Sequence, residues 1–377
     1  MKYKLKEIGE IISGGTPSTK RSDFYATKGI GWITPKDLSN YHKKYICHGA
    51  RDISKIGLDN SSAKIMPPNS ILVSSRAPIG YVAMAEESLA TNQGFKSIIP
   101  DVSKVLPDYL YYLMLNSKSK LEQVASGSTF KEVSGKTMAN FEVDIPEIQK
   151  QKYIISLLNP IVKKIELNNQ INDNLLELAK TIFKNIIKTS SLHALTINDV
   201  GTVIGGGTPS KKVPKYWNGN IPWISPKDLS NHPNVFTSHG ENSITQNGLD
   251  HSSTKLLPQK TVLFSSRAPI GYISIANNEI TTNQGFKSVI PDKNYPFWFI
   301  YELLKSETPK IINEANGSTF KEISGGKLKQ HKTSIPTSIE VMKYNSIFLP
   351  IFEKIQQFEE EIDKLNQIKD ILLNKFF

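Results

Sequence analysis

The sequence contains one set of motifs twice, in the same order. Gly14–Ser18 (GGTPS) returns as Gly206–Ser210, and the eight residues SSRAPIGY at Ser74–Tyr81 recur unchanged at Ser265–Tyr272. Three more pairs are Pro35–Asn40 with Pro226–Asn231 (PKDLSN), Thr91–Ser97 with Thr282–Ser288 (TNQGFKS), and Gly127–Glu132 with Gly317–Glu322 (GSTFKE). Equivalent positions lie about 191 residues apart, whereas solenoid and propeller repeats are roughly 20–50 residues long. The pattern therefore predicts two copies of one large domain, and hence a target with two similar halves.

The charge balance narrows the class of partner. The 377 residues include 46 Lys and Arg against 35 Asp and Glu, which gives a formal net charge of +11. A basic chain favours an anionic partner, and nucleic acid is the commonest large one, although a protein that is merely lysine-rich has the same balance. Cys47 is the only cysteine, so an internal disulfide is impossible and a cytoplasmic location is expected. The N-terminus does not resemble a signal peptide, and no apolar run of about 18 residues predicts a membrane span.

Each copy divides into a globular part and a long helix. Residues 1–146 contain short strand patterns broken by Gly and Pro, together with one helical pattern. Residues 191–336 repeat this plan, and helical segments at 147–190 and 337–377 follow the two globular parts. The predicted fold class is α+β, with two similar globular α/β domains joined by two long helices.

The two long helical segments carry matched apolar seams. Their apolar residues recur at spacings of three and four over about four heptads, which indicates a coiled coil. Pro160 and Pro350 occupy equivalent places, where we expect a kink or a restarted helix because proline removes a helical hydrogen bond. We expect an antiparallel coiled coil with pseudo-two-fold symmetry; the alternative is that each segment is an amphipathic helix on its own domain. The predicted seam residues are Leu158, Ile161, Ile165, Leu175, Ile182, Phe348, Ile351, Ile355, Ile362, Leu365 and Leu372.

Arginine is scarce, and two of the four arginines are duplicated. Arg21, Arg51, Arg76 and Arg267 stand against 42 lysines, and Arg76 and Arg267 occupy the same place in the two copies. Arginine binds guanine or phosphate through two parallel hydrogen bonds, and the serines beside these two arginines suit phosphate contact. The alternative is a scaffold ion pair, for instance with the duplicated Asp37 and Asp228, and the two interpretations are evenly matched.

Further DNA-contact candidates lie in the other duplicated turns. The amides of the TNQG turns suit adenine, and the hydroxyls and lysines of the GGTPS, PKDLSN and GSTFKE turns suit phosphate. The alternative in each case is a structural turn whose polar groups bond to the local backbone. The candidates are Thr16, Ser18, Lys20, Lys36, Ser74, Ser75, Arg76, Asn92, Gln93, Lys96, Ser128, Thr129 and Lys131 in the first copy, and Thr208, Ser210, Lys211, Lys227, Ser265, Ser266, Arg267, Asn283, Gln284, Lys287, Ser318, Thr319 and Lys321 in the second.

The remaining conspicuous residues indicate structure rather than catalysis. Trp32 and Trp223 are expected in the core. Ser134–Thr137 ends like a phosphate-binding loop, but Phe130 stands where its first glycine is required, so no nucleotide site is predicted. No catalytic residue, metal site or cofactor of this chain's own is expected. The sequence predicts a binding protein.

In these motifs the chain closely resembles the specificity subunit of Type I restriction–modification enzymes. The resemblance is carried by the GGTPS turn, Tyr216–Ile224 (YWNGNIPWI), the Asn-Gln-Gly-Phe strand and the Ile-Pro that precedes Gln151–Ile155 (QKYII). It covers essentially the whole chain in the order target-recognition domain, helix, target-recognition domain, helix. The first copy departs from the family pattern at Asp23–Gly31, and the second helix lacks the Gln-Lys-Tyr-Ile start.

The resemblance implies a non-catalytic subunit that binds a bipartite double-stranded DNA site. It implies two methyltransferase subunits, which carry S-adenosylmethionine and methylate adenine N6, and two ATP-driven restriction subunits that cut unmodified DNA. Residues shared by both copies are expected to serve the scaffold and the phosphate contacts, and they predict related half-sites. Base reading is expected where the copies diverge, at 20–31 against 211–221 and at 41–55 against 232–246.

Three other functions fit the residues less well. They are the targeting half of a different restriction class, a self-sufficient methyltransferase, and a coiled-coil adaptor that binds only protein. The missing catalytic motifs weigh against the second, and a salt-sensitive interaction with duplex DNA would exclude the third.

Overall fold

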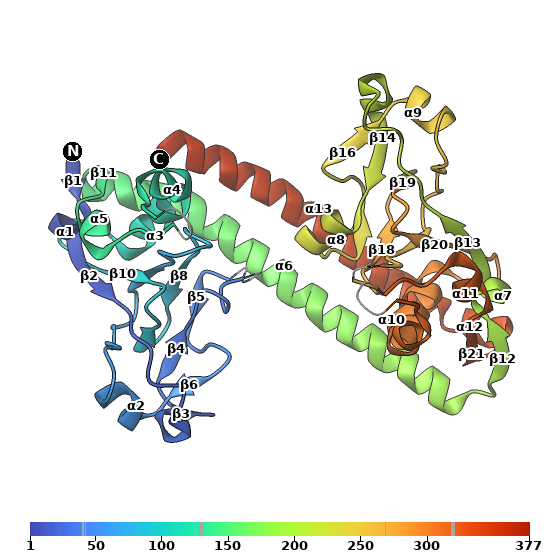
Figure 1. Ribbon diagram of the computed structural model, residues 1–377, viewed down its shortest axis with the longest axis horizontal. Helices are drawn as coiled ribbons and strands as arrows, with labels where there is room; N and C mark the ends of the chain where they lie inside the picture. Colours follow the sequence, from blue (N-terminus) through green and yellow to red (C-terminus); the bar gives the residue numbers. More distant parts are fainter. Residues whose placement is uncertain (40, 42, 128–130, 268, 318–320) are drawn as a thin grey trace. The chain divides into compact units, whose positions relative to one another are not determined.

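The computed structural model describes the whole chain except residues 40, 42, 128–130, 268 and 318–320. It is a mixed α/β structure that divides into two compact units (Figure 1). Unit 1 comprises residues 1–167 and 363–377, and unit 2 comprises residues 168–362. Each unit therefore contains one globular domain and a segment of each long helix. Within the described residues, no helix is both long and apolar enough to cross a bilayer.

The domain of unit 1 is built on a five-stranded sheet with strand order β2-β10-β7-β8-β5. These strands are Gly9–Ser13, Lys96–Pro100, Ile71–Val73, Val82–Ala85 and Tyr45–Ile46, respectively. Neighbours are antiparallel except β5, which runs parallel to β8. Because side chains alternate along a strand, Ile71 and Val73 pack with helix α3 (Pro107–Asn116), whereas Leu72 packs in a second cluster with Phe95. The sheet is thus covered on both faces.

Short strand pairs and helices complete the first domain. The pairs are β1 (Lys2–Lys4) with β11 (Glu142–Asp144), β3 (Tyr25–Ala26) with β6 (Asp52–Ile53), and β4 (Gly31–Ile33) with β9 (Leu89–Thr91). The helices are α1 (Leu5–Ile8), η1 (Ser22–Phe24), α2 (Lys55–Asp59), α4 (Lys118–Val124) and α5 (Gly135–Ala139). Figure 1 shows β3, β6 and α2 at one end of the domain, with β1 and β11 at the opposite end.

Unit 2 repeats this plan. Its five-stranded sheet has the order β13-β20-β17-β18-β15, with β13 at Gly201–Gly205, β20 at Lys287–Pro291, β17 at Val262–Phe264, β18 at Ile273–Ala276 and β15 at Phe236–Thr237. The other strands are β12 (His193–Thr196), β14 (Trp217–Ile224), β16 (Asn242–Ile244), β19 (Thr281–Thr282) and β21 (Lys332–Ile335). The shorter helices are α7 (Ile197–Val200), η2 (Pro214–Tyr216), α8 (Pro226–Asn231), α9 (Gln246–Asp250), α11 (Gly325–Gln330) and α12 (Ser338–Met342). One continuous helix, α10 (Phe297–Glu314), stands in place of α3 and α4.

The two long helices are α6 (Ile148–Thr189) and α13 (Asn345–Phe376). Pro160 and Pro350 lie inside them, so the expected restart at these prolines is wrong. Pro160 is exposed, where water replaces the lost backbone hydrogen bond, and Pro350 lies within the first two turns of α13. The second helical segment is interrupted earlier, because α12 ends at Met342.

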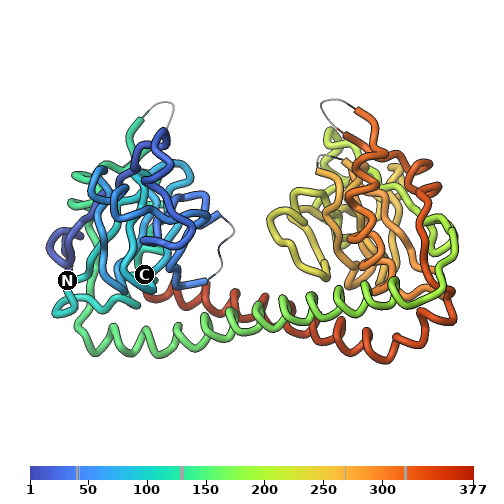
Figure 2. Tube along the Cα trace, turned by 90° about the horizontal axis from the view of Figure 1, so that it is seen from below, coloured from blue at the N-terminus to red at the C-terminus, as the bar shows by residue number. Residues whose placement is uncertain are grey.

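Each unit by itself pairs the start of one long helix with the end of the other, so the helices run antiparallel. In unit 1, Ile154 and Leu158 of α6 share a buried cluster with Leu373 of α13. Figure 2 shows the last turns of α13 near the first turns of α6. In unit 2, Phe183 of α6 shares a cluster with Phe352 of α13. Both clusters also contain core residues of the unit's own domain. Each long helix therefore packs against the other long helix, as the coiled-coil seam predicts, and against a domain, as the amphipathic-helix alternative predicts.

The predicted seam residues are all buried or partly buried. Leu158, Ile165, Phe348, Ile351 and Ile355 are buried. Ile161, Leu175, Ile182, Ile362, Leu365 and Leu372 are partly buried. The apolar stripe therefore faces inward along both helices.

Candidate nucleic-acid interface

The duplicated turns meet on one surface of each domain. A Cβ atom added to Gly14 would lie 1.9 Å from the carbonyl oxygen of Asn92, and one added to Gly206 would lie 2.0 Å from that of Asn283. Only glycine allows this approach, so the GGTPS turn packs directly on the TNQG turn. The hydroxyl of Thr16 also bonds to the side-chain amide oxygen of Gln93, and Thr208 and Gln284 repeat this bond.

The duplicated tryptophans support the same surface from the interior of each domain. Trp32 and Trp223 are buried, as predicted, and their indole N–H groups donate to Gly15 O at 3.0 Å and Gly207 O at 2.9 Å. Each indole therefore satisfies its one polar group by holding the GGTPS turn in place.

The duplicated aspartates hold turns and do not pair with the arginines. Asp37 accepts hydrogen bonds from Thr34 N at 2.7 Å and Ala50 N at 2.8 Å, and Asp228 bonds in the same way to Ser225 N and Glu241 N. The alternative of an ion pair between these aspartates and Arg76 or Arg267 is therefore wrong. Asp37 instead ties the loop before Arg51 to the PKDLSN turn.

The expectation that the four duplicated serines contact phosphate is wrong. Ser74, Ser75, Ser265 and Ser266 have no solvent-exposed surface. Ser74 Oγ donates to Pro78 O at 2.7 Å, and Ser75 Oγ donates to Gly94 O at 3.1 Å; the second copy repeats both bonds. A buried hydroxyl that is already bonded has no group to offer to DNA, so these serines shape the turns.

Arg76 and Lys96 share one carboxylate. Glu132 lies 2.9 Å from Arg76 Nε and 3.6 Å from Lys96 Nζ. The Lys96 side chain is only 10 % exposed, so it is a scaffold group, whereas Arg76 remains 49 % exposed. In the second copy Glu322 lies 3.9 Å from Lys287 Nζ, and burial lowers the pKa of Lys287.

The asparagines of the TNQG turns serve their own backbone. Asn92 Oδ1 accepts a hydrogen bond from Gly94 N at 2.9 Å, and Asn283 Oδ1 accepts one from Gly285 N at 2.8 Å. For these two residues the structure agrees with the alternative of a structural turn, whose polar groups bond to the local backbone. The neighbouring Gln93 and Gln284 are exposed.

The candidates that remain open to solvent are mostly lysines. Ser18, Lys20, Lys36, Gln93, Lys131, Ser210, Lys211, Lys227, Gln284 and Lys321 are exposed, and Thr16, Thr208 and Arg267 are partly buried. Lys227 forms a surface ion pair with Glu241 at 3.0 Å. Ser128, Thr129, Ser318 and Thr319 lie outside the described residues.

One arginine that the sequence analysis did not select has an unusual setting. The guanidinium carbon of Arg51 lies 3.9 Å from the centre of the Tyr25 ring and 5.7 Å from that of Trp32. Arg51 is exposed and stands in one of the segments that diverge between the copies. That divergence was the available sequence signal, but the aromatic partner, 26 positions earlier in the chain, was not readable.

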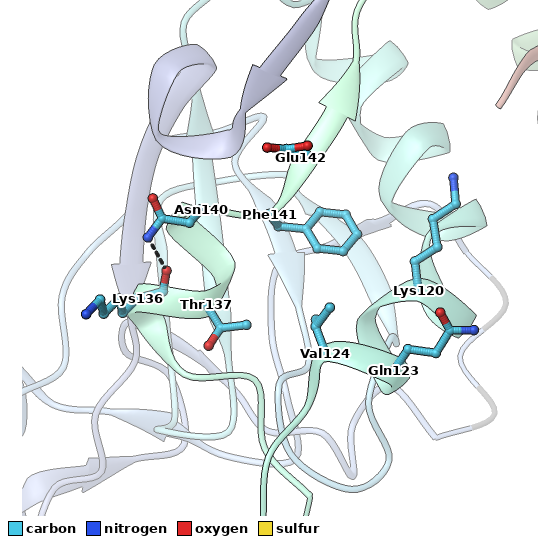
Figure 3. Close-up of a pocket in the computed structure, with 8 residues that line it drawn as sticks. All are labelled: Lys120, Gln123, Val124, Lys136, Thr137, Asn140, Phe141 and Glu142. Atoms are coloured by element: carbon cyan, nitrogen blue, oxygen red, sulfur yellow. Dashed lines mark hydrogen bonds between the residues drawn. The ribbon is translucent and has the colours of Figure 1, made fainter.

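Unit 1 also contains a pocket that none of the predicted DNA-contact residues line. This pocket of about 580 Å³ lies between α4, α5 and β11, with Phe141 and Val124 on its apolar side and Lys120 and Lys136 at its rim (Figure 3). In unit 2, His331 occupies the place of Phe141 and forms hydrogen bonds to Glu307 and Glu314. The described lining of the pocket contains neither a nucleophile paired with a base nor a pair of carboxylates.

Comparison with known proteins agrees with the repeated architecture. The family model described as "Type I restriction modification DNA specificity domain" matches residues 1–177 and 193–370. The MjaIX specificity subunit of Methanocaldococcus jannaschii is 30% identical, with 99% of this chain and 91% of that protein covered. The HindI specificity subunit of Haemophilus influenzae is 22% identical over 98% of this chain and 97% of its own length. The crystal structure of the S subunit from M. genitalium superposes with a TM-score of 0.62 at 15% identity, covering 100% of this chain and 96% of that one. The chain therefore belongs to the family of Type I restriction–modification DNA specificity subunits, the component that recognises DNA sequence and is not itself catalytic.

Proposed function

We propose that each domain reads one half of a bipartite duplex DNA site, using the surface on which the duplicated turns meet. The observation that carries this proposal is the repetition of that surface, with the same glycine contact and the same Thr–Gln bond in both units. Two copies of one DNA-reading surface suit a target with two similar halves. The two strands of duplex DNA are equivalent, so each copy can bind one half-site in the same way.

The chemistry of the surface supports contact with the DNA backbone. Lys20 and Lys36 in unit 1 and Lys211 in unit 2 are exposed, and within the described residues none has an ion-pair partner. Such lysines release counterions from DNA when they bind phosphate, which makes binding salt-dependent. We assign base reading to the segments at 20–31 and 41–55 of the first copy and at 211–221 and 232–246 of the second.

Specificity subunits of this family act within complexes with other restriction–modification subunits and DNA. We propose that this chain holds two methyltransferase subunits, and two restriction subunits where these exist. S-adenosylmethionine and ATP would bind to those partners, and the target adenine would leave the base stack to reach the methyltransferase. The cell interior, where chromosomal DNA lies, is the location this role requires.

The decisive experiment is a comparison of methylated adenines. The chain and its methyltransferase subunit are expressed together in a host without other adenine methylation, and the genome is sequenced for N6-methyladenine. The proposal expects a two-part motif that disappears without this chain. Methylation without the chain, or a single continuous motif, would contradict it.

A further inference from the structure

The aromatic platform beneath Arg51 is a rigid structure. The Tyr25 hydroxyl donates to Pro17 O at 2.8 Å, and the ring meets Trp32 edge to face, with the two ring centres 5.9 Å apart. Trp32 in turn bonds to Gly15 O. Both rings are therefore tied to the GGTPS turn, and the Arg51 guanidinium lies over the face of a ring that is itself held in place.

Stacking leaves the hydrogen-bonding edge of this guanidinium free. Arg21 gives its two N–H groups to Asp23 at 2.8 and 2.6 Å, and Arg76 gives its Nε to Glu132. Arg51 has no carboxylate partner among the described residues. The adjacent Asp52 is buried, and its carboxylate faces His48 and Gly29 N.

The position of Arg51 places that free edge beside the duplicated turns. Ala50 is bonded to Asp37 of the PKDLSN turn, and Tyr25 is bonded to the GGTPS turn. The exposed Lys28 lies in the neighbouring loop, whose Gly29 is bonded to Asp52. A planar fork with free donors can bind phosphate or the O6/N7 edge of guanine in the major groove. Arg51 stands where the two copies diverge, whereas phosphate contacts are expected from residues that both copies share, so guanine is the ligand that fits its position.

The second copy keeps the platform and changes the residue on it. Trp217 replaces Tyr25, donates to Ser210 O at 3.2 Å and meets Trp223 edge to face at 5.1 Å. The residue equivalent to Arg51 is Asn242, which is exposed at the start of β16. The two domains therefore present different polar groups at one place on an otherwise shared surface.

We propose that Arg51 is a specificity-determining residue that reads a guanine in the half-site bound by the first domain. This inference rests on the proposed function of the surface. The second half-site then has no arginine-read guanine at the equivalent position, so the half-sites are related but differ there.

The test uses the full chain with its methyltransferase subunit and maps N6-methyladenine across a host genome. In Arg51→Lys and Arg51→Asn, methylation is expected at sites with any base pair at one position of one half-site, while the rest of the motif stays unchanged. Preference for guanine at that position should fall by about tenfold to a hundredfold, the discrimination expected from one bidentate contact. Arg51→Lys is decisive because lysine keeps the charge and loses the two-pronged geometry.

Two further variants serve as controls. Lys6→Asn removes an exposed cation on α1, outside the segments assigned to base reading, and it should leave the motif unchanged. Asn242→Arg places the fork on the second platform, and it should add a guanine preference to the other half-site only. Unchanged thermal unfolding of all four variants would show that the domains remain folded.

The possible outcomes distinguish a failure of this inference from a failure of the proposed function on which it rests. Equal weakening of methylation at all sites, without a changed motif, would assign Arg51 to phosphate and overturn the inference. An unchanged motif and unchanged activity in Arg51→Asn would also overturn it. If the wild-type complex methylates no bipartite motif, the proposed function itself fails.

Discussion

The ammonium of Lys44 forms an ion pair with the carboxylate of Asp108, and it also lies 2.8 Å from Asn159 Oδ1. The pair joins the loop before β5 to α3 and to the first turns of α6. Burial lowers the pKa of Lys44, and Asp108 opposes this effect. In the second copy the equivalent residues are Val235, Trp298 and Leu349, so all three polar members have been replaced together by largely apolar ones.

Removing one partner of this cluster should destabilise unit 1. Asp108→Ala leaves the Lys44 ammonium, which is 5% exposed, without its counter-ion, and it should lower the free energy of unfolding by about 2 kcal/mol. This expected loss of stability is smaller than the loss for a fully buried ion pair, because the Asp108 side chain is 29% exposed. The triple variant Lys44→Val, Asp108→Trp, Asn159→Leu, which installs the residues of the second copy, should recover most of the loss. Denaturant unfolding followed by circular dichroism measures both, and equal losses in the two variants would contradict the cluster's role.

Stability should depend on pH through Glu302. This carboxyl is buried in α10, where burial raises its pKa to about 7 from the ordinary value of 4.5. Between these two values the folded protein holds a proton that the unfolded chain has lost, so stability falls as pH rises and is level above pH 7. The total effect is about 3 kcal/mol.

Glu302→Gln should remove this pH dependence and stabilise unit 2 at pH 8. Glu302→Leu, which replaces the carboxyl with an apolar side chain, should do the same. Glu353→Gln, an exposed change on α13, is the control. Thermal unfolding between pH 5 and pH 8 measures the profiles, and parallel curves for wild type and Glu302→Gln would refute this assignment.

Gly14 should tolerate no side chain. Gly14→Ala forces a methyl group to within 1.9 Å of Asn92 O, and it should cost about 1–3 kcal/mol of stability and separate the two turns. Gly326→Ala is the matched control, because a Cβ there meets no atom within 4 Å and alanine favours the helix by up to about 1 kcal/mol. Calorimetric unfolding compares the two, and a neutral Gly14→Ala would show that the turn packing is adjustable.

Exposed lysines at the turns should set the salt dependence of DNA binding. Lys20→Gln and Lys36→Gln should each reduce the slope of log K against log salt by about 0.9 if each contacts one phosphate. Lys6→Gln, on α1, should leave the slope unchanged. Ser75→Ala should reduce stability and not the slope, since its hydroxyl is buried. Fluorescence anisotropy on duplex DNA at several salt concentrations measures the slopes, and an equal drop for Lys6→Gln would show that charge acts without regard to position.

The parts of the fold that depend on local pattern could be predicted from the sequence. The apolar spacing predicted a helix at 147–190, and α6 spans Ile148–Thr189. The tryptophans were expected in the core and are there. Of the two outcomes expected at the prolines, the restart does not occur and the kink stays a prediction. The cost of a proline depends on its exposure and on its distance from the helix start, which apolar spacing does not show.

The candidate site was harder to predict from the sequence. Whether a side chain can contact DNA depends on its exposure and on bonds to residues far away in the sequence, and neither is visible in a motif. Ser74 and Ser75 have the composition of a phosphate-binding turn, but they lie in the interior. Arg76 was compared with Asp37, whereas its partner Glu132 stands 56 positions later in the sequence. Arg51 depends on an aromatic ring of β3, which pairs with the strand that follows Arg51 but stands 26 positions earlier in the sequence.

The cluster of Lys44, Asp108 and Asn159 limits how these domains are exchanged between chains. A chimera joined at residue 147 would carry Lys44 and Asp108 onto the other helix, where Leu349 replaces Asn159. The transplanted ammonium would then face an aliphatic side chain. Functional grafts should therefore place the junction beyond Asn159, so that the first turns of α6 travel with the domain they support.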